Sequence, residues 1–156
     1  MKKILVAIDP ANIESAYCVI DTETYKPLDF GKIPNKELLY ILQQPFAKDA
    51  VVAIEMIASY GMAVGKEVFE TCLWIGRYIQ AAETAGAKVE LIYRKDVKMN
   101  LCGSMRAKDT NIRQALIDRF GDVGTKNNQG YFYGFKADIW AAFAVGVTYL
   151  DMKGRG

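Results

Sequence analysis

The sequence contains no histidine and only three cysteines. The lack of histidine excludes His-ligated zinc sites, Ser-His-Asp and Cys-His nucleophilic triads, and imidazole as a general base. Because Cys18, Cys72 and Cys102 form no closely spaced pair, we expect reduced thiols that pack as small apolar side chains in an intracellular protein. Any hydrolytic chemistry must therefore depend on carboxylates, lysines and bound metal.

Long hydrophobic runs are also missing. The N-terminal apolar run stops at Asp9 and is too short for the core of a signal peptide, which needs about 7–15 residues. No segment approaches the roughly 20 uninterrupted apolar residues of a membrane span. We therefore expect a cytoplasmic protein without a membrane partner.

Charged side chains are unevenly distributed, although the formal net charge is only +2. Residues 1–87 contain 8 basic and 11 acidic side chains, whereas residues 88–136 contain 10 basic and 5 acidic ones. The second segment therefore carries a charge of +5, which favours a surface that binds a polyanion. An ordinary solvated face is the alternative explanation.

Apolar patterning predicts an α/β fold in one domain, residues 1–156. Short turns link the first three strands, which predicts an antiparallel meander, and a crossover helix predicts that the fourth and fifth strands are parallel. Asn35 is expected to cap the first helix, Pro45 to stop it, and Gly86 to end the second. Segment 122–134 is expected to be a mobile loop. The expected strands are 3–9, 16–20, 26–32, 50–55 and 88–93, and the expected helices are 36–43, 66–84, 106–120 and 138–150.

Three acidic residues stand where apolar elements end or begin. Asp9 and Glu55 end the runs ILVAI and VVAI, and Asp138 opens the apolar final helix. The carboxyl ends of neighbouring buried strands open onto one crevice, so Asp9 and Glu55 are expected to face a common point, with Asp138 added by a helix that starts at the same edge. Oxygen donors without histidine select Mg²⁺, with Mn²⁺ as a substitute.

Each of these acids also has a structural explanation. Asp138 is consistent with a charge that the helix dipole favours, and Asp9 before a proline is consistent with turn chemistry. Glu55 is harder to explain in this way, because a carboxylate between VVAI and MIA is costly to bury unpaired. The three positions together favour a metal site over three unrelated structural roles.

The segments LVAIDP, VVAIEM and ADIWAAFAVG, with the basic stretch VKMNLCGSMRAKDTNIRQAL, resemble RuvC-type Holliday-junction resolvases in order over nearly the whole chain. The compact length looks more like the versions carried by phages, which implies the host cytoplasm as the location. The resemblance implies an RNase H-like α/β fold, in which a mixed central sheet of three antiparallel strands plus parallel strands is flanked by helices. It also implies a homodimer that binds four-way junctions and other branched DNA.

Carried over by position, Asp9, Glu55 and Asp138 match catalytic metal-binding acids, and Lys98 and Lys108 match basic residues near the scissile phosphate. The family usually has a fourth acid where this sequence has Ala141. On the helix 66–84, the large side chains Trp74 and Tyr78 suit a two-fold interface, with a role in the helix core as the alternative.

Basic and aromatic residues supply candidate DNA contacts. Phosphate contacts are independent of sequence and weaken with salt, which suits a protein that recognises the shape of a branch. Tyr60 follows Glu55 by five residues and is the expected wedge at a crossover. The aromatics of segment 131–135 suit either base stacking or packing at the rim of the site, and packing is favoured. The expected phosphate contacts are Arg94, Lys95, Lys98, Arg106, Lys108 and Arg113, with Lys126 and Lys136 flanking the late loop.

The leading hypothesis from the sequence is a Mg²⁺-dependent, structure-selective endodeoxyribonuclease that resolves Holliday junctions. Water would attack the phosphodiester in line and leave a 5′-phosphate and a 3′-hydroxyl. Two alternatives stay open. One is a junction-binding protein with weak or lost catalysis, suggested by Ala141, and the other is a less selective nuclease of branched DNA, because many activities share this fold.

Overall fold

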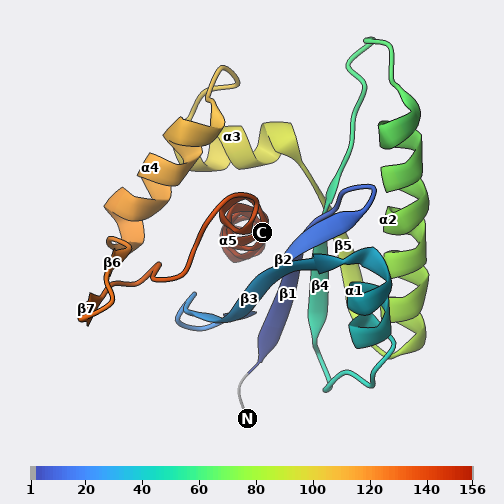
Figure 1. Cartoon of the computed structure of the whole chain (residues 1–156), viewed down its shortest axis with the longest axis horizontal. Coiled ribbons are helices and arrows are strands. Elements are labelled where there is room, and N and C mark those ends of the chain that lie inside the picture. Colours follow the sequence, from blue (N-terminus) through green and yellow to red (C-terminus); the bar gives the residue numbers. More distant parts are fainter. Residues whose placement is uncertain (1–2, 156) are drawn as a thin grey trace.

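The computed structural model describes residues 3–155. A five-stranded sheet in the order β3-β2-β1-β4-β5 has helices on both faces, which confirms the α/β class (Figure 1). The elements are β1 (Ile4–Asp9), β2 (Glu14–Asp21), β3 (Pro27–Pro34), α1 (Asn35–Leu42), β4 (Val51–Met56), α2 (Lys66–Thr84), β5 (Lys88–Tyr93), α3 (Arg94–Cys102), α4 (Asp109–Phe120), β6 (Gly124–Thr125), β7 (Asn128–Gln129) and α5 (Ile139–Arg155).

The sheet is mixed, as predicted. Strands β1, β2 and β3 form the antiparallel meander, with a register shift between Val19 and Ile20. Strand β4 pairs in parallel with both β1 and β5, because α2 carries the chain back across the sheet between β4 and β5. Helix α2 has the predicted bounds, and Gly86 follows its end with a φ of +102°. This topology places the ends of β1 and β4 side by side at one edge.

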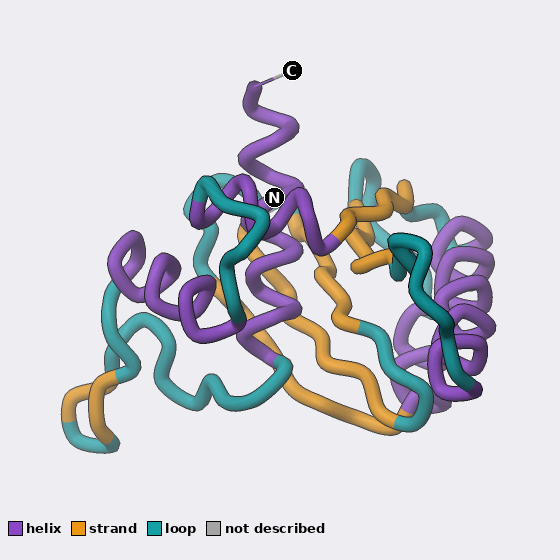
Figure 2. The backbone as a smooth tube through the Cα atoms, turned by 90° about the horizontal axis from the view of Figure 1, so that it is seen from above, coloured by secondary structure: helices purple, strands orange, loops and turns teal. Residues whose placement is uncertain are grey.

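Both faces of the sheet are buried, which explains the unbroken apolar runs of β1 and β4. Leu5 and Ala7 point to the layer that contains α5, whereas Val6 and Ile8 point to the layer that contains α1 and α2. Figure 2 shows α5 against one side of the sheet, with α4 and the β6–β7 hairpin beyond it, and α1 and α2 on the opposite side. In the range 3–155, no helix is both long and apolar enough to cross a membrane.

Helix α5 approaches the sheet most closely at Gly146. A Cβ atom there would lie 2.3 Å from Ile20 Cδ1 and 3.1 Å from the Cβ of Ala7, and both neighbours are fully buried. We therefore predict that Gly146→Val lowers the free energy of unfolding by about 2–3 kcal/mol, because an overpacked core forces the backbone to shift. Urea denaturation measures this loss. Gly154→Ala is the matched control in the same helix, since nothing lies within 4 Å of a Cβ at that position, and a comparable loss there would contradict the packing argument.

Several local predictions were wrong. Helix α3 was not predicted, because only Val97 of its residues is buried and its apolar pattern is therefore weak. The helix expected at 106–120 begins only at Asp109. Asn35 lies inside α1 instead of capping it. Its side chain donates a hydrogen bond to the Ala11 carbonyl at 2.7 Å and accepts one from the Ser15 hydroxyl at 2.7 Å.

Segment 122–134 is more ordered in its secondary structure than the expected loop. It contains the β6–β7 hairpin, which is closed by two glycines that leave no room for a side chain. A Cβ on Gly124 would lie 2.3 Å from the Gly130 nitrogen, and one on Gly130 would lie 2.1 Å from the Asp122 oxygen. The chain then turns and buries Phe132 completely before it enters α5.

Candidate metal centre and nucleic-acid interface

Asp9 and Glu55 leave the sheet side by side. Ile8 pairs with Ile54 in the parallel register of β1 and β4, so the residues that follow each of them are neighbours on adjacent strands. The alternation along both strands also places these two side chains on the face that α5 covers, together with Ala7 and Ala53. Strand order and pleat thus direct both carboxylates to one point.

Asp138 reaches the same point from the other layer. It lies immediately before α5, and its carbonyl oxygen accepts the hydrogen bond of the Ala142 amide at 3.0 Å. Burial and, to a lesser extent, the negative charges of Glu55 and Asp138 together raise the pKa of Asp9 to about 8. Burial also raises the pKa of Glu55, to which the charge of Asp138 adds. The three carboxylates therefore repel one another within one neighbourhood.

Two cations partly compensate this negative charge. Lys32 Nζ lies 2.7 Å from Asp138 Oδ2, and the Arg94 guanidinium lies 3.7 Å from Glu55 Oε2. Arg94 also forms an ion pair with Asp109. Among residues 3–155, the Asp9 carboxylate has neither a hydrogen bond nor an ion pair. Asp9 is thus the central acid and the one without a counter-charge in contact.

Lys32 and Asp109 were not anticipated from the sequence. Lys32 pairs with Ala16 across β3 and β2, and Ala16 pairs with Asp9 across β2 and β1, so Lys32 lies in the same cross-strand row as Asp9. Directly paired residues point to the same face of a sheet. The register of the meander was the only signal that would have identified Lys32, and the sequence did not define that register. Asp109 looked like an ordinary acidic residue in the first turn of a helix.

The arrangement suits a divalent cation in its chemistry, although it is not assembled around one. All donors are carboxylate oxygens, which Mg²⁺ and Mn²⁺ prefer. Glu55 Oε2 is buried and accepts no hydrogen bond, which is costly unless another positive group is bound. In the part of the chain that the structure describes, no three acidic or cysteine side chains are close enough together to hold a metal ion. Lys32 and Arg94 hold the two outer carboxylates instead.

A basic cavity adjoins the carboxylates through Arg94. It has a volume of about 220 Å³ and is lined by Tyr60, Arg94, Lys95, Lys98 and Met105. Four of the predicted DNA contacts thus lie together. Tyr60 comes from the loop after β4, and Arg94, Lys95 and Lys98 come from α3. Tyr60 is 61% exposed and has a φ of +50°, so its ring is presented to solvent.

The other predicted basic contacts lie along the start of α4. Arg106 and Lys108 are exposed just before the helix, and Lys108 is its N-cap. Arg113 packs over the ring of Trp140, with 4.8 Å between the guanidinium carbon and the ring centroid. Arg113 therefore has a packing contact of its own, which the sequence did not indicate.

The late aromatic residues pack inside the protein. Phe132 and Phe135 are buried against Trp140 and Phe143, with ring centroids 4.7 Å to 5.6 Å apart. Tyr131 stacks on Phe120 at 5.2 Å. These side chains thus have the packing role that the sequence favoured. Tyr133 is partly exposed and is the aromatic residue of this segment that could still stack on a base.

Tyr78 was wrongly considered for an interface. It is fully buried, and its hydroxyl forms a hydrogen bond with the Ser15 hydroxyl at 3.0 Å. Trp74 is half-buried, and Arg77 lies over its ring at 4.7 Å. The large side chains of α2 that face solvent are Phe69 and Leu73, which are 61% and 69% exposed. The apolar stripe of the sequence identified the helix correctly but not which side of it is free.

The protein has a mixed α/β, RNase H-like fold. This class is defined by the sheet order, with helices on both faces of the sheet and carboxylates at one edge. No protein-family model matches the chain, and no curated protein sequence does. Solved structures of Thermus thermophilus RuvC do match, both alone and in complex with a Holliday junction substrate. For RuvC alone the TM-score is 0.68 at 16% identity, over 97% of this chain and 96% of that one. For the complex the TM-score is 0.68 at 16% identity, over 99% and 96%.

This chain therefore has the RuvC fold over almost its whole length. The resemblance stated from the sequence is confirmed at the level of the fold. The phage-like version stays a prediction, because the sequence identity is too low to distinguish subtypes.

Proposed function

We propose that this protein is a structure-selective endodeoxyribonuclease that resolves four-way DNA junctions by metal-dependent phosphodiester hydrolysis. The observation that supports the proposal is the electrostatic coupling of Asp9 with Glu55 and Asp138, which come from three separate segments, together with the adjoining basic cavity. One of the solved structures with this fold is a complex with a Holliday junction substrate. The end of β1 does not need a buried, unpaired carboxylate such as that of Asp9 for stability.

Each group in the site would have a separate task. Asp9, Glu55 and Asp138 would hold Mg²⁺, with Mn²⁺ as a substitute. A bound divalent cation supplies the positive charge that lets a nucleophile approach a phosphodiester. Lys95 and Lys98 would bind the neighbouring phosphates, and Tyr60 would stack on a base at the branch point, where bases are least constrained.

Cleavage assays on matched DNA substrates test the proposal. Labelled four-way junctions, forks, flaps and linear duplexes of the same sequence are incubated with the protein in Mg²⁺. We expect paired nicks in the four-way junction at a rate at least about tenfold above that for the linear duplex. Equal cleavage of all the substrates would indicate a less selective nuclease, and an uncut set would contradict the enzymatic function.

A junction-binding protein with weak catalysis is the second candidate. It is favoured by the lack of an assembled three-carboxylate group within residues 3–155 and by Ala141, which supplies no oxygen next to Asp138. This candidate predicts tight junction binding with no cleavage in either Mg²⁺ or Mn²⁺. The same substrate set distinguishes the two functions when binding and cleavage are measured in parallel.

The basic cavity predicts a phosphate contact at Lys98. Lys98→Gln should weaken junction binding about three- to tenfold at low salt and reduce the slope of log affinity against log salt by about 1, because one phosphate contact is lost. Fluorescence anisotropy over a salt series measures both quantities. Lys48→Gln is the matched control, since Lys48 is exposed before β4 at the opposite end of the sheet, and an equal change of slope there would contradict a localised contact.

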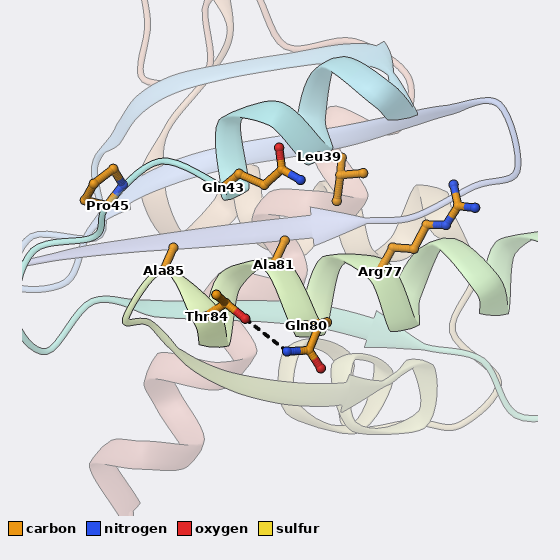
Figure 3. Close-up of a pocket in the computed structure, with 8 residues that line it drawn as sticks. All are labelled: Leu39, Gln43, Pro45, Arg77, Gln80, Ala81, Thr84 and Ala85. Atoms are coloured by element: carbon orange, nitrogen blue, oxygen red, sulfur yellow. Dashed lines mark hydrogen bonds between the residues drawn. The ribbon is translucent and has the colours of Figure 1, made fainter.

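A homodimer would place two such sites on the two symmetric strands of a junction, and α2 offers the surface for it. Phe69 and Leu73 are exposed on one side of α2, and Tyr40 of α1 is 65% exposed. Between the two helices lies a groove of about 740 Å³, in which Leu39 of α1 and its C-cap residue Gln43 face Arg77, Ala81 and Thr84 of α2 (Figure 3). A large exposed apolar surface of this kind marks an interaction site.

Leu73→Glu is expected to convert the dimer to a monomer, because a carboxylate would be buried without a partner at a two-fold interface. Sedimentation velocity measures the mass in solution. Met152→Glu serves as the control, since Met152 is 42% exposed on α5, on the other side of the sheet. A Leu73→Glu variant that still sediments as a dimer would place the interface elsewhere.

A further inference from the structure

Arg94 lies beside the carboxylates of the site and forms ion pairs with Glu55 and Asp109. It is the first residue of α3 and directly follows the last residue of β5, so its backbone is fixed at the same sheet edge as the acids. Its guanidinium lies 3.7 Å from Glu55 Oε2 and also pairs with Asp109 on α4. The Arg94 side chain is only 30% exposed. It also lines both the basic cavity and the small cavity beside Asp138.

The charges around Asp9 leave room for one divalent cation. Three carboxylates meet two cations there, since the groups that act on Asp9 are Glu55, Asp138, Arg94 and Lys32. Asp109, which pairs with Arg94, adds a fourth carboxylate. One divalent cation would bring these groups to neutrality, and a second would leave an excess of two positive charges, or of one with a phosphodiester bound, in a partly buried site where like charges are poorly screened.

The available oxygen donors also favour a single divalent cation. Two metal ions about 3.5–4 Å apart need carboxylates to bridge and flank them. Next to Asp138, however, the wall of the small cavity consists of Ile112, Trp140 and Ala141, which offer no oxygen toward it. Asp109 lines the same cavity, but its carboxylate is paired with Arg94. Ligands for a second ion are therefore lacking.

We propose that this centre binds a single divalent cation and that the Arg94 guanidinium supplies the second positive charge to the phosphodiester. The inference rests on the proposed function. Asp109 positions the guanidinium from α4, and Glu55 is shared between Arg94 and the ion. An arginine is suited to this role, because its planar fork contacts a carboxylate and a phosphate together and stays charged at all physiological pH values.

The test is the stoichiometry and affinity of Mn²⁺ binding to the full chain. Calorimetry and electron paramagnetic resonance are applied to the free protein and to its complex with a junction that carries phosphorothioate linkages around the crossover. We expect one Mn²⁺ per chain in both states. Arg94→Gln should bind Mn²⁺ about tenfold more tightly in the free protein, because a positive charge beside Glu55 is removed, and should still cleave more slowly.

Arg94→Lys should keep the wild-type Mn²⁺ affinity within about threefold, since the positive charge is retained. Lys153→Gln removes a cation at the exposed end of α5 and should leave Mn²⁺ binding unchanged. Ala141→Asp adds a carboxylate to the small cavity without disturbing Arg94, and it should still bind one ion. In the Arg94→Gln/Ala141→Asp double variant, a second ion is expected.

Three results would overturn the inference. Two Mn²⁺ ions per wild-type chain, or two in Ala141→Asp with Arg94 intact, would show that Arg94 does not occupy the second position. An unchanged or weaker Mn²⁺ affinity in Arg94→Gln would reduce Arg94 to a structural residue. Both of these leave the nuclease function standing, whereas a wild-type protein that binds no Mn²⁺ at millimolar concentration would overturn the inference and the proposed function together.

Discussion

Asp9→Asn is expected to lower the single-turnover rate of four-way junction cleavage by at least about 10³-fold, because it would remove the central carboxylate of the proposed metal site. Asp9 is the acid on which the charges of Glu55, Asp138, Arg94 and Lys32 all act. Affinity for the junction should stay within about threefold of wild type, since the proposed phosphate contacts line the neighbouring basic cavity and do not include Asp9. Quenched-flow cleavage and anisotropy on the same junction give the two quantities.

Asp49→Asn is the matched control for this variant. Asp49 is exposed before β4, at the opposite end of the sheet, and has a φ of +67°, a conformation that asparagine adopts as readily as aspartate. It should cleave at the wild-type rate. If Asp9→Asn and Asp49→Asn cut the junction equally fast, Asp9 has no role in catalysis.

The second large effect of Asp9→Asn is on stability. The substitution should lower the rate of cleavage but raise the free energy of unfolding. The pKa of Asp9 is raised to about 8 in the folded protein, first by burial and then by Glu55 and Asp138. A raised pKa means that the folded state binds the proton more tightly than the unfolded chain does. The contribution of Asp9 to stability is therefore greatest below about pH 4 and is lost progressively as the pH rises toward 8. Without metal, the raised pKa of Asp9 should lower the free energy of unfolding at neutral pH by roughly 2–4 kcal/mol relative to a carboxyl with an unshifted pKa.

Asp9→Asn should therefore be more stable than the wild type in chelator at pH 7–8, and the difference should shrink as the pH falls toward 4. Millimolar Mg²⁺ should stabilise the wild type and leave Asp9→Asn nearly unchanged, because the variant would lack a carboxylate of the proposed metal site. Urea denaturation across this pH range, with chelator and with Mg²⁺, measures both effects. If the wild type is more stable than Asp9→Asn in chelator at pH 8, the Asp9 carboxylate does not destabilise the folded protein.

Elements buried on both faces were the easiest to predict. β1 and β4 have unbroken apolar runs because α5 covers one side of the sheet and α1 and α2 cover the other. The length and period of α2 defined its bounds, and the crossover that it forms defined the parallel pairing of β4 with β5. From the apolar runs and the acids that end them, the neighbourhood of Asp9 and Glu55 followed directly.

The rest depended on contacts that no local pattern records. The polar helix α3 buries only Val97, so its sequence has almost no hydrophobic periodicity. Lys32 meets Asp138 across 106 residues of sequence, and only the register of the meander brings them together. Arg94 looked like one more basic residue in a basic segment, although its position after β5 places it among the acids. The sequence therefore indicated the three neighbouring acids but not the cations beside them.

The central claim is that Asp9, Glu55 and Asp138 hold the same divalent cation. Mn²⁺ affinity, measured by calorimetry for the wild type and for Asp9→Asn, Glu55→Gln and Asp138→Asn, tests it most directly. The account predicts that each single substitution weakens Mn²⁺ binding by at least about tenfold. If the three variants bind Mn²⁺ with wild-type affinity, the carboxylates do not form a metal centre.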